Sequence, residues 1–333
     1  MNVYLGTMNI DYPFKSDLSK EEEYEIVNRY LSLCPSGCRY LDTAYYYAKG
    51  KTHRSLCEIL NRFEKFENGG SSNVKIATKV NPWYDNDFTS GRLGGLSSEQ
   101  IRQQTLISLR DLGMEKVDIM FLHAYDYETP LEETLRTMHE LYKEGKWGEW
   151  GLSNFSLQQC EEVMRICEEK EYKKPKVYQG MYNVLCRKVE EVFPLLEKEG
   201  MCFWAYNPLC GGLVSGKKSK ESGRFSNPIY QSIFWNKDMV NVCEKLNELA
   251  HSHSMKGGGI ELALCWLRDH SKLRKGKDAI LLGASTVSQF QQNWDILHSP
   301  SFLEGESLWL VKVERIMREL SMHFPNSIPN YWY

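Results

Sequence analysis

Short apolar runs rich in β-branched and aromatic residues alternate along the chain with longer segments whose apolar residues recur at helical spacing. The short runs predict eight strands. These strands are expected at residues 3–8, Tyr40–Ala44, Val74–Val80, Val117–His123, Trp147–Ser153, Val177–Gln179, Met201–Tyr206 and Ala279–Gly283. The longer segments predict helices at Ser19–Leu33, Thr52–Phe66, Ser97–Leu112, Pro130–Lys143, Ser156–Cys167, Lys188–Glu199, Asp238–His253 and Gly259–Asp269.

The order of these elements favours a (β/α)8 TIM barrel. Regular alternation of strand and helix is typical of a parallel sheet with helices outside, and eight such units fit about 280 residues. A doubly wound open sheet is the alternative, but its first turn normally carries G-x-G-x-x-G, whereas this chain has LGTMNIDYPF there. Ser97 predicts a helix start, and Gly113 and Gly145 predict helix ends. We expect one barrel domain over residues 1–333.

Two long polar segments interrupt the alternation, at Asn81–Leu96 and Gly211–Trp235. Each follows a predicted strand, so both would leave the barrel on the side where barrel enzymes bind ligands. Loops of this length are usually functional. They predict long ligand-side loops.

The composition of the chain argues against several classes of binding partner. A net charge of −3 in 333 residues gives no basic surface for nucleic acid or an anionic membrane. No apolar stretch approaches the roughly 18 residues of a spanning helix, and the N-terminus does not resemble a signal peptide. Ten scattered cysteines without a C-x-x-C pair indicate free thiols, a cytoplasmic location and no metal site. The oligomeric state stays open, with a homodimer as one option.

Four polar residues lie at or just beyond the carboxyl ends of three predicted strands: Asp42, Tyr47, Lys79 and His123. Taken singly, each has an ordinary explanation as a turn cap, a packed ring, a solvated strand end or a core histidine. Their shared position predicts that they meet at one face of a barrel.

Together the four side chains suit the delivery of a proton to a carbonyl oxygen. A free phenol has a pKa of about 10, and a neighbouring ammonium such as Lys79 lowers it. Asp42 can hold Lys79 in place, and His123 can hydrogen-bond a carbonyl oxygen. The set contains no nucleophile, so a hydride would come from a nicotinamide.

The chain resembles the aldo-keto reductase superfamily, and within it the aflatoxin aldehyde reductase group, over essentially its whole length. The segments that carry the resemblance are LDTAYYY, KIATKVNPW, VDIMFLHAYD, EETLRTMHELYKEGK, WGLSNF, VYQGMYN and FWAYNPLCGGLVSGK. The resemblance implies Tyr47 as proton donor rather than Tyr45 or Tyr46. It also implies Lys79 as the group that lowers the pKa of Tyr47, with Asp42 as the partner of Lys79 and His123 as the substrate-orienting residue.

The same resemblance implies an NADP(H) site, with NADP(H) preferred over NAD(H). Ser153, Asn154 and Gln179 match positions that hydrogen-bond the carboxamide, and Tyr206 matches an aromatic residue that stacks on the nicotinamide. The phosphate end is expected to involve Asn207, Pro208, Leu209, Gly211, Gly212, Lys217, Arg224, Gly283, Ser285, Gln289 and Asn293. Related chains carry more cationic residues near the last strand, so Lys217 and Arg224 would supply much of the positive charge.

The substrate is expected to be a small carbonyl compound. Met8, Tyr12, Trp83 and Trp235 lie on predicted ligand-side loops and would form an apolar pocket. The first loop has Asp11 and no arginine, which favours neutral or aromatic aldehydes over carboxylated ones. Two other functions stay open: a regulatory subunit resembling potassium-channel β subunits, and a phosphate-sugar isomerase on the same fold.

Overall fold

The computed structural model describes residues 1–11, 18–66, 73–216, 225, 228–300, 308–323 and 325–331. Their strands form one closed parallel barrel in chain order, and β8 pairs with β1. The strands are β1 Asn2–Gly6, β2 Tyr40–Asp42, β3 Lys75–Val80, β4 Val117–Leu122, β5 Trp147–Ser153, β6 Val177–Met181, β7 Cys202–Tyr206 and β8 Ala279–Leu282. The predicted (β/α)8 barrel is therefore confirmed.

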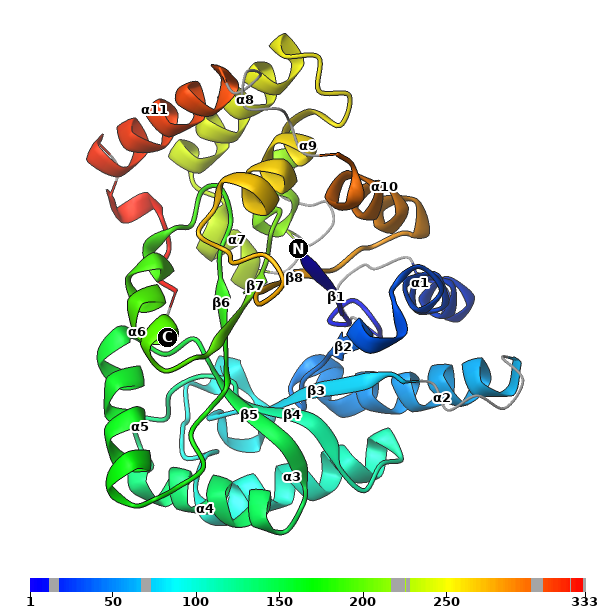
Figure 1. Ribbon diagram of the computed structural model, residues 1–333, viewed down its shortest axis with the longest axis vertical. Coiled ribbons are helices and arrows are strands. Elements are labelled where there is room, and N and C mark those ends of the chain that lie inside the picture. The colour runs from blue at the N-terminus through cyan, green and yellow to red at the C-terminus, as the bar shows by residue number, and fades with distance from the viewer. Residues whose placement is uncertain are drawn as a thin grey trace.

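Helices surround the strands on the outside of the barrel (Figure 1). Their bounds are α1 Lys20–Leu33, α2 Lys51–Phe66, α3 Ser98–Leu112, α4 Leu131–Lys143, α5 Leu157–Glu169, α6 Phe193–Lys198, α7 Pro228–Phe234, α8 Lys237–Ser252, α9 Gly258–Cys265, α10 Val287–His298 and α11 Leu308–His323. The last helix, α11, packs against α8 at the top of the view in Figure 1.

Local sequence signals explain where several helices begin and end. Ser19 forms a capping box with Glu22 at the start of α1, and each satisfies a backbone N–H of the other. Gly113 ends α3 with a φ of 67°, a conformation that costs glycine little. Ser97 occupies the N-cap of α3 as expected, although its side chain makes no capping hydrogen bond.

Three helices of the structure were not predicted from the sequence. The segment 211–235, expected as a loop, contains α7, and the chain after β8 forms α10 and α11. In α10, Phe290, Trp294 and Leu297 are buried at helical spacing after the N-cap Thr286. That pattern is readable in the sequence, because residues three and four apart share one face of a helix.

The barrel interior is filled by its own small cluster of side chains, separate from the larger core between strands and helices. The interior cluster consists of Tyr4, Ala77, Ile119, Phe121, Val177, Trp204, Ala279 and Leu281. Because side chains alternate along a strand, Ala77 and Lys79 both face inward while Ile76 and Val80 face the helices. Lys79 therefore lies one layer above the apolar interior, toward the carboxyl end.

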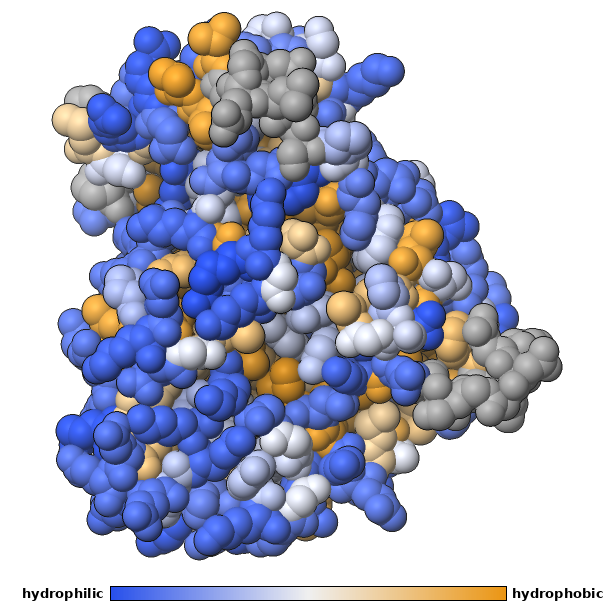
Figure 2. All heavy atoms as spheres, viewed as in Figure 1, coloured by the Kyte–Doolittle hydropathy of each residue, from blue (hydrophilic) through white to orange (hydrophobic). Residues whose placement is uncertain are grey.

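The face drawn in Figure 2 is mostly hydrophilic, with hydrophobic residues visible in smaller groups between the polar ones. Within the described ranges, no helix combines the length and apolarity that crossing a membrane would require.

Candidate active site

The carboxyl ends of the strands carry most of the unusual backbone in the described residues. Among the residues that the structure describes, non-glycine residues with positive φ follow β1, β2, β3, β5 and β7, and two others lie elsewhere. Those at strand ends are Asp11, Ala48, Lys49, Asp85, Asn86, Asn154, Asn207 and Cys210, and the other two are Glu171 and Ser254. Strained backbone of this kind gathers at functional sites, and barrel enzymes bind substrates at this face.

Lys79 and Asp42 form a buried ion pair between β3 and β2. The Lys79 Nζ donates to Asp42 Oδ1 at 2.9 Å, to Asp42 Oδ2 at 2.8 Å and to the Thr43 carbonyl at 2.7 Å. Three acceptors around Nζ match the three protons that an ammonium can donate. Gln179 Nε2 donates to Asp42 Oδ1 at 2.8 Å from across the barrel, which fixes the carboxylate further.

Burial works against both charges of this pair. Lys79 is completely buried and Asp42 nearly so. The loss of hydration lowers the pKa of Lys79 and raises the pKa of Asp42, while their mutual attraction opposes both shifts. The result is a positive charge held rigidly inside the barrel, where the local dielectric is low.

Tyr47 lies next to this charge. It begins a 3-10 turn, Tyr47–Gly50, directly beyond β2. The Lys79 Nζ lies 5.2 Å from the centre of the Tyr47 ring, and the Tyr47 ring is 6.1 Å from the His123 ring. Tyr46 also reaches His123, with ring centres 6.3 Å apart, and Tyr47 reaches both His123 and Lys79.

His123 follows β4 and completes the quartet. Its ring is buried, and its Nδ1 has no hydrogen-bond partner within the described part of the chain. Burial first, and then the charge of Lys79, lower the pKa of His123 well below 6.5. The imidazole is therefore neutral near pH 7, with one nitrogen as donor and the other as acceptor.

Asn154 links three of the predicted site residues at the end of β5. Its Nδ2 donates to the His123 carbonyl at 2.9 Å and to Ser153 Oγ at 3.1 Å, and its Oδ1 accepts from the Tyr206 hydroxyl at 2.8 Å. Asn154 has a φ of 59°, a conformation that asparagine tolerates better than most residues. Hydroxyl and amide groups that both donate and accept form a set that suits a carboxamide.

The glycine-rich segment after β7 makes a series of tight turns. Gly211 and Gly212 have φ of 67° and 97°. The Gly211 N–H donates to Asn207 Oδ1 at 2.5 Å, and the Gly212 N–H donates to the Leu209 carbonyl at 2.8 Å. A Cβ added to Gly212 would have open space around it, which leaves room for close approach of another molecule. Pro208 is buried at the start of this segment.

The residues predicted for the adenosine phosphate lie at the start of α10. Gln289 Oε1 accepts from the Ser285 N–H at 3.2 Å, so the Gln289 side chain folds back over the turn. Asn293 is buried on the inner face of α10, while Gly283 and Ser285 are half-buried. Lys217, Arg224 and the pocket residue Tyr12 lie outside the described residues.

Trp83, one of the predicted pocket residues, lies beside the quartet. Its ring is 5.1 Å from His123, 4.9 Å from Tyr46 and 5.1 Å from Phe88. Met8 Sδ lies 3.7 Å from the Tyr230 hydroxyl. The Trp235 ring packs against the Phe225 ring, with ring centres 4.9 Å apart.

Several residues of the site were not expected from the sequence. Tyr46 and Phe88 extend the aromatic surface beside His123. Thr43 accepts from Lys79 through its carbonyl, and Thr7 donates to the Asp42 carbonyl from both its N–H and its hydroxyl, each at 2.9 Å. Backbone acceptors leave no signature in a sequence, because every residue has a carbonyl.

The sequence matches known proteins over most of its length. The model of the Aldo/keto reductase family matches residues 2–302. The human protein aflatoxin B1 aldehyde reductase member 4 is 38% identical over 271 residues, which cover 76% of this chain and 77% of that protein. Human aflatoxin B1 aldehyde reductase member 2 is 37% identical over 269 residues, which cover 76% of this chain and 71% of that protein.

Among solved structures, a glycerol dehydrogenase from Gluconobacter oxydans superposes with a TM-score of 0.70. The match covers 100% of this chain and 95% of that one at 23% sequence identity. At this identity the likeness shows the barrel fold alone.

Proposed function

The chain belongs to the aldo/keto reductase family, and on that premise we propose that it reduces aldehydes or ketones to alcohols with NADPH. The observation that carries the proposal is the Lys79 ammonium, which Asp42 holds 5.2 Å from the Tyr47 ring. A buried positive charge beside a phenol stabilises the phenolate that remains after the phenol has given up its proton.

In this proposal Tyr47 is the general acid. A bound reduced nicotinamide would supply the hydride to the carbonyl carbon. Tyr47 gives its proton to the carbonyl oxygen as negative charge develops there. Lys79 stabilises the phenolate left behind, and Asp42 and Gln179 keep Lys79 in place through the contacts described above. His123, as a neutral imidazole, hydrogen-bonds the carbonyl oxygen and orients it.

The cofactor site proposed from the resemblance fits the residues that the structure describes. Ser153, Asn154 and Gln179 would hold the carboxamide, and the Tyr206 ring, anchored by its hydroxyl on Asn154, would lie against the nicotinamide. The Gly211 and Gly212 N–H groups donate within their own segment. The segment would therefore contribute to the pyrophosphate site mainly because its glycines let the backbone lie close to the phosphates.

Preference for NADP(H) over NAD(H) rests on Lys217 and Arg224 in the sequence. We also propose that the whole chain forms one domain. The hydrogen bond that the Tyr331 hydroxyl donates to Glu191 supports this, because it ties the last described residue to the barrel. The cytoplasmic location and the homodimer stay predictions.

The substrate is proposed to be a neutral or aromatic carbonyl compound. Tyr46, Trp83 and Phe88 form an aromatic surface beside His123. Two human relatives are named as aflatoxin B1 aldehyde reductases, so an aldehyde as the substrate is consistent with their names. An apolar wall next to a few convergent polar groups is the usual design of a small-molecule site.

The test is turnover of an aldehyde panel with NADPH by the wild-type chain, Tyr47→Phe and Tyr46→Phe. Loss of general-acid catalysis should lower kcat by about 10²–10⁴-fold in Tyr47→Phe, with the NADPH Kd within twofold of wild type. Tyr46→Phe, which keeps the ring on Trp83, should retain most of its turnover. Tight NADPH binding without turnover by the wild type would favour a regulatory subunit, and failure to bind NADPH would favour an isomerase.

A further inference from the structure

The turn that carries Tyr47 is held in a conformation that its residues do not favour. Ala48 and Lys49 have φ of 46° and 54°, and Gly50 follows with a φ of 84°. Two consecutive non-glycine residues in the left-handed region persist only where the surrounding structure imposes them. The contacts at the two ends of this turn therefore decide where Tyr47 lies.

The near end of the turn is tied to β1 and β3. The Thr7 N–H and hydroxyl both donate to the Asp42 carbonyl at 2.9 Å. The Thr43 N–H donates to the Ala77 carbonyl at 2.8 Å, and the Tyr45 N–H donates to the Lys79 carbonyl at 3.2 Å. These bonds continue the barrel ladder past the last paired residue of β2.

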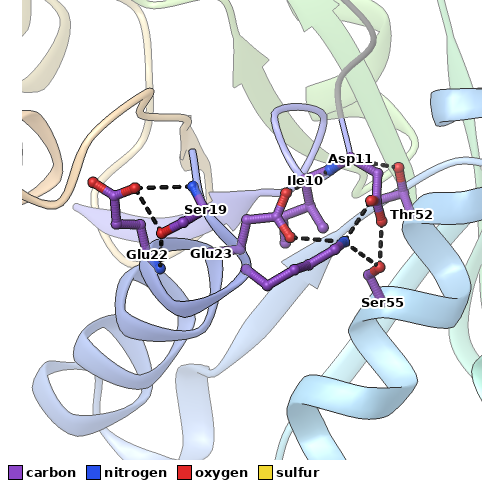
Figure 3. A network of polar contacts seen from close by, with 8 residues as sticks. Ile10, Asp11, Ser19, Glu22, Glu23, Thr52 and Ser55 are labelled. Atoms are coloured by element: carbon purple, nitrogen blue, oxygen red, sulfur yellow. Dashed lines mark hydrogen bonds and ion pairs between the residues drawn. The ribbon is translucent and has the colours of Figure 1, made fainter. Parts of the chain in front are cut away.

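The far end is tied back to the same β1 loop by the first turn of α2. Thr52 Oγ1 donates to the Ile10 carbonyl at 2.9 Å, and Ser55 donates to the Asp11 carboxylate (Figure 3). Lys20 binds Asp11, Glu23 and Ser55, and the buried Glu23 accepts the Asp11 N–H at 2.7 Å. The short segment from Thr7 to Asp11 thus braces both ends of the Tyr47 turn.

A second tether runs from α2 to the strand that carries Lys79. His53 is completely buried, and its Nε2 lies 3.0 Å from Thr78 Oγ1. Thr78 faces the helices while its neighbour Lys79 faces the barrel, because side chains alternate along β3. The His53–Thr78 bond therefore fixes the start of α2 against the backbone that positions the Lys79 ammonium.

We propose that Thr52 and His53 are positioning residues for the proton transfer, which hold the Tyr47 turn at a set distance from Lys79 through their bonds to Ile10 and Thr78. This inference rests on the proposed function, because it assigns a role in the Tyr47 reaction. Neither residue needs to touch substrate or cofactor. A displacement of about 1 Å in a reacting group can lower a rate by up to 10²-fold, so small relaxations of the turn would be measurable.

The test compares Thr52→Val, Thr52→Ser and the control Thr137→Val. Thr137 is also a buried helix threonine whose hydroxyl donates to a backbone carbonyl, that of Glu133, at 2.9 Å, and this bond lies within α4. We expect kcat about tenfold lower in Thr52→Val, with the NADPH Kd unchanged. Thr52→Ser should restore turnover because it keeps the hydroxyl. The control also loses one buried hydroxyl bond and should keep its kcat.

Hydrogen exchange of the peptide that covers residues 43–51 provides a readout that does not depend on turnover. Exchange there should be faster in Thr52→Val and normal in Thr52→Ser and Thr137→Val. Thr78→Val, which removes the partner of His53, should reproduce both effects and serves if Thr52→Val does not fold. Wild-type kcat and exchange in both Val variants at positions 52 and 78 would overturn this inference alone. Absence of turnover in the wild-type chain would overturn the proposed function and the inference together.

Discussion

The Lys79 Nζ lies 2.8 Å from Asp42 Oδ2 and 2.9 Å from Asp42 Oδ1, inside a barrel where neither side chain is appreciably exposed. Two charges taken out of water depend on each other, because each alone would lack the hydration that it has lost. The pair therefore affects stability, and in the proposed mechanism it also supports catalysis. These two effects can be separated by experiment.

Asp42→Asn should destabilise the protein by about 3–5 kcal/mol, because it leaves the Lys79 ammonium without its carboxylate. The double variant Asp42→Leu with Lys79→Met should recover much of that free energy of unfolding, since apolar side chains need no partner. It should nevertheless show no turnover. Urea unfolding and aldehyde reduction measured on both variants check the prediction, and equal stability of the single and double variants would contradict it.

His53 should make the folded state less stable in mild acid. Burial lowers the pKa of His53 to about 4, whereas a histidine in an unfolded chain has a pKa of about 6.5. Between these values the unfolded chain binds a proton that the folded chain does not. The free energy of unfolding is therefore highest above about pH 6.5, where His53 is neutral in both states, and it falls as the pH drops toward 4.

His53→Gln removes this titration, and the measurement is the free energy of unfolding at pH 7.5 and pH 5.0. From the two pKa values, the wild type should lose about 2 kcal/mol more than the variant over that interval. Parallel pH curves for the two proteins would mean that His53 takes up its proton normally in the folded chain.

Asn154→Ala should weaken NADPH binding by about tenfold, because it frees the Tyr206 hydroxyl and Ser153 Oγ from their shared partner. Part of any change comes from placing alanine at a positive φ, so a control with the same backbone is needed. Glu171 has a φ of 55° and is exposed in the loop after α5. Glu171→Ala should leave the NADPH Kd, measured by fluorescence titration, at the wild-type value.

The aromatic surface beside His123 should favour aromatic substrates. We expect a higher kcat/KM for 4-nitrobenzaldehyde than for succinic semialdehyde, because a carboxylate would lose hydration against Tyr46, Trp83 and Phe88. A clearly better kcat/KM for the carboxylated aldehyde would exclude the proposed substrate class.

Trp83→Ala tests the same surface by changing the protein instead of the substrate. It should raise the KM for 4-nitrobenzaldehyde by about tenfold, the effect expected from about 1.4 kcal/mol of lost contact. Propanal, which is too small to cover the indole, should show a KM close to that of the wild type. An equal rise for both aldehydes would place Trp83 in support of His123 rather than in the substrate pocket.

The barrel and the placement of the quartet were readable in the sequence. Strand and helix periodicities differ clearly, and parallel strands in chain order bring all carboxyl ends to one face. Asp42, Lys79 and His123 could thus be assigned to one site before any distance was known. Tyr47 was predicted as the proton donor from the family resemblance, because the sequence pattern does not distinguish it from the adjacent Tyr45 and Tyr46. That role stays a prediction.

Only the tertiary structure decided what surrounds those groups. The contact of Lys79 with the Thr43 carbonyl, of Gln179 with Asp42 and of His53 with Thr78 joins residues that lie on different elements or use the backbone. Such contacts depend on the register of neighbouring strands and on how α2 lies against β3. A sequence records which groups are present and on which face of an element they lie. The distances between them arise when the packed barrel fixes one element against another.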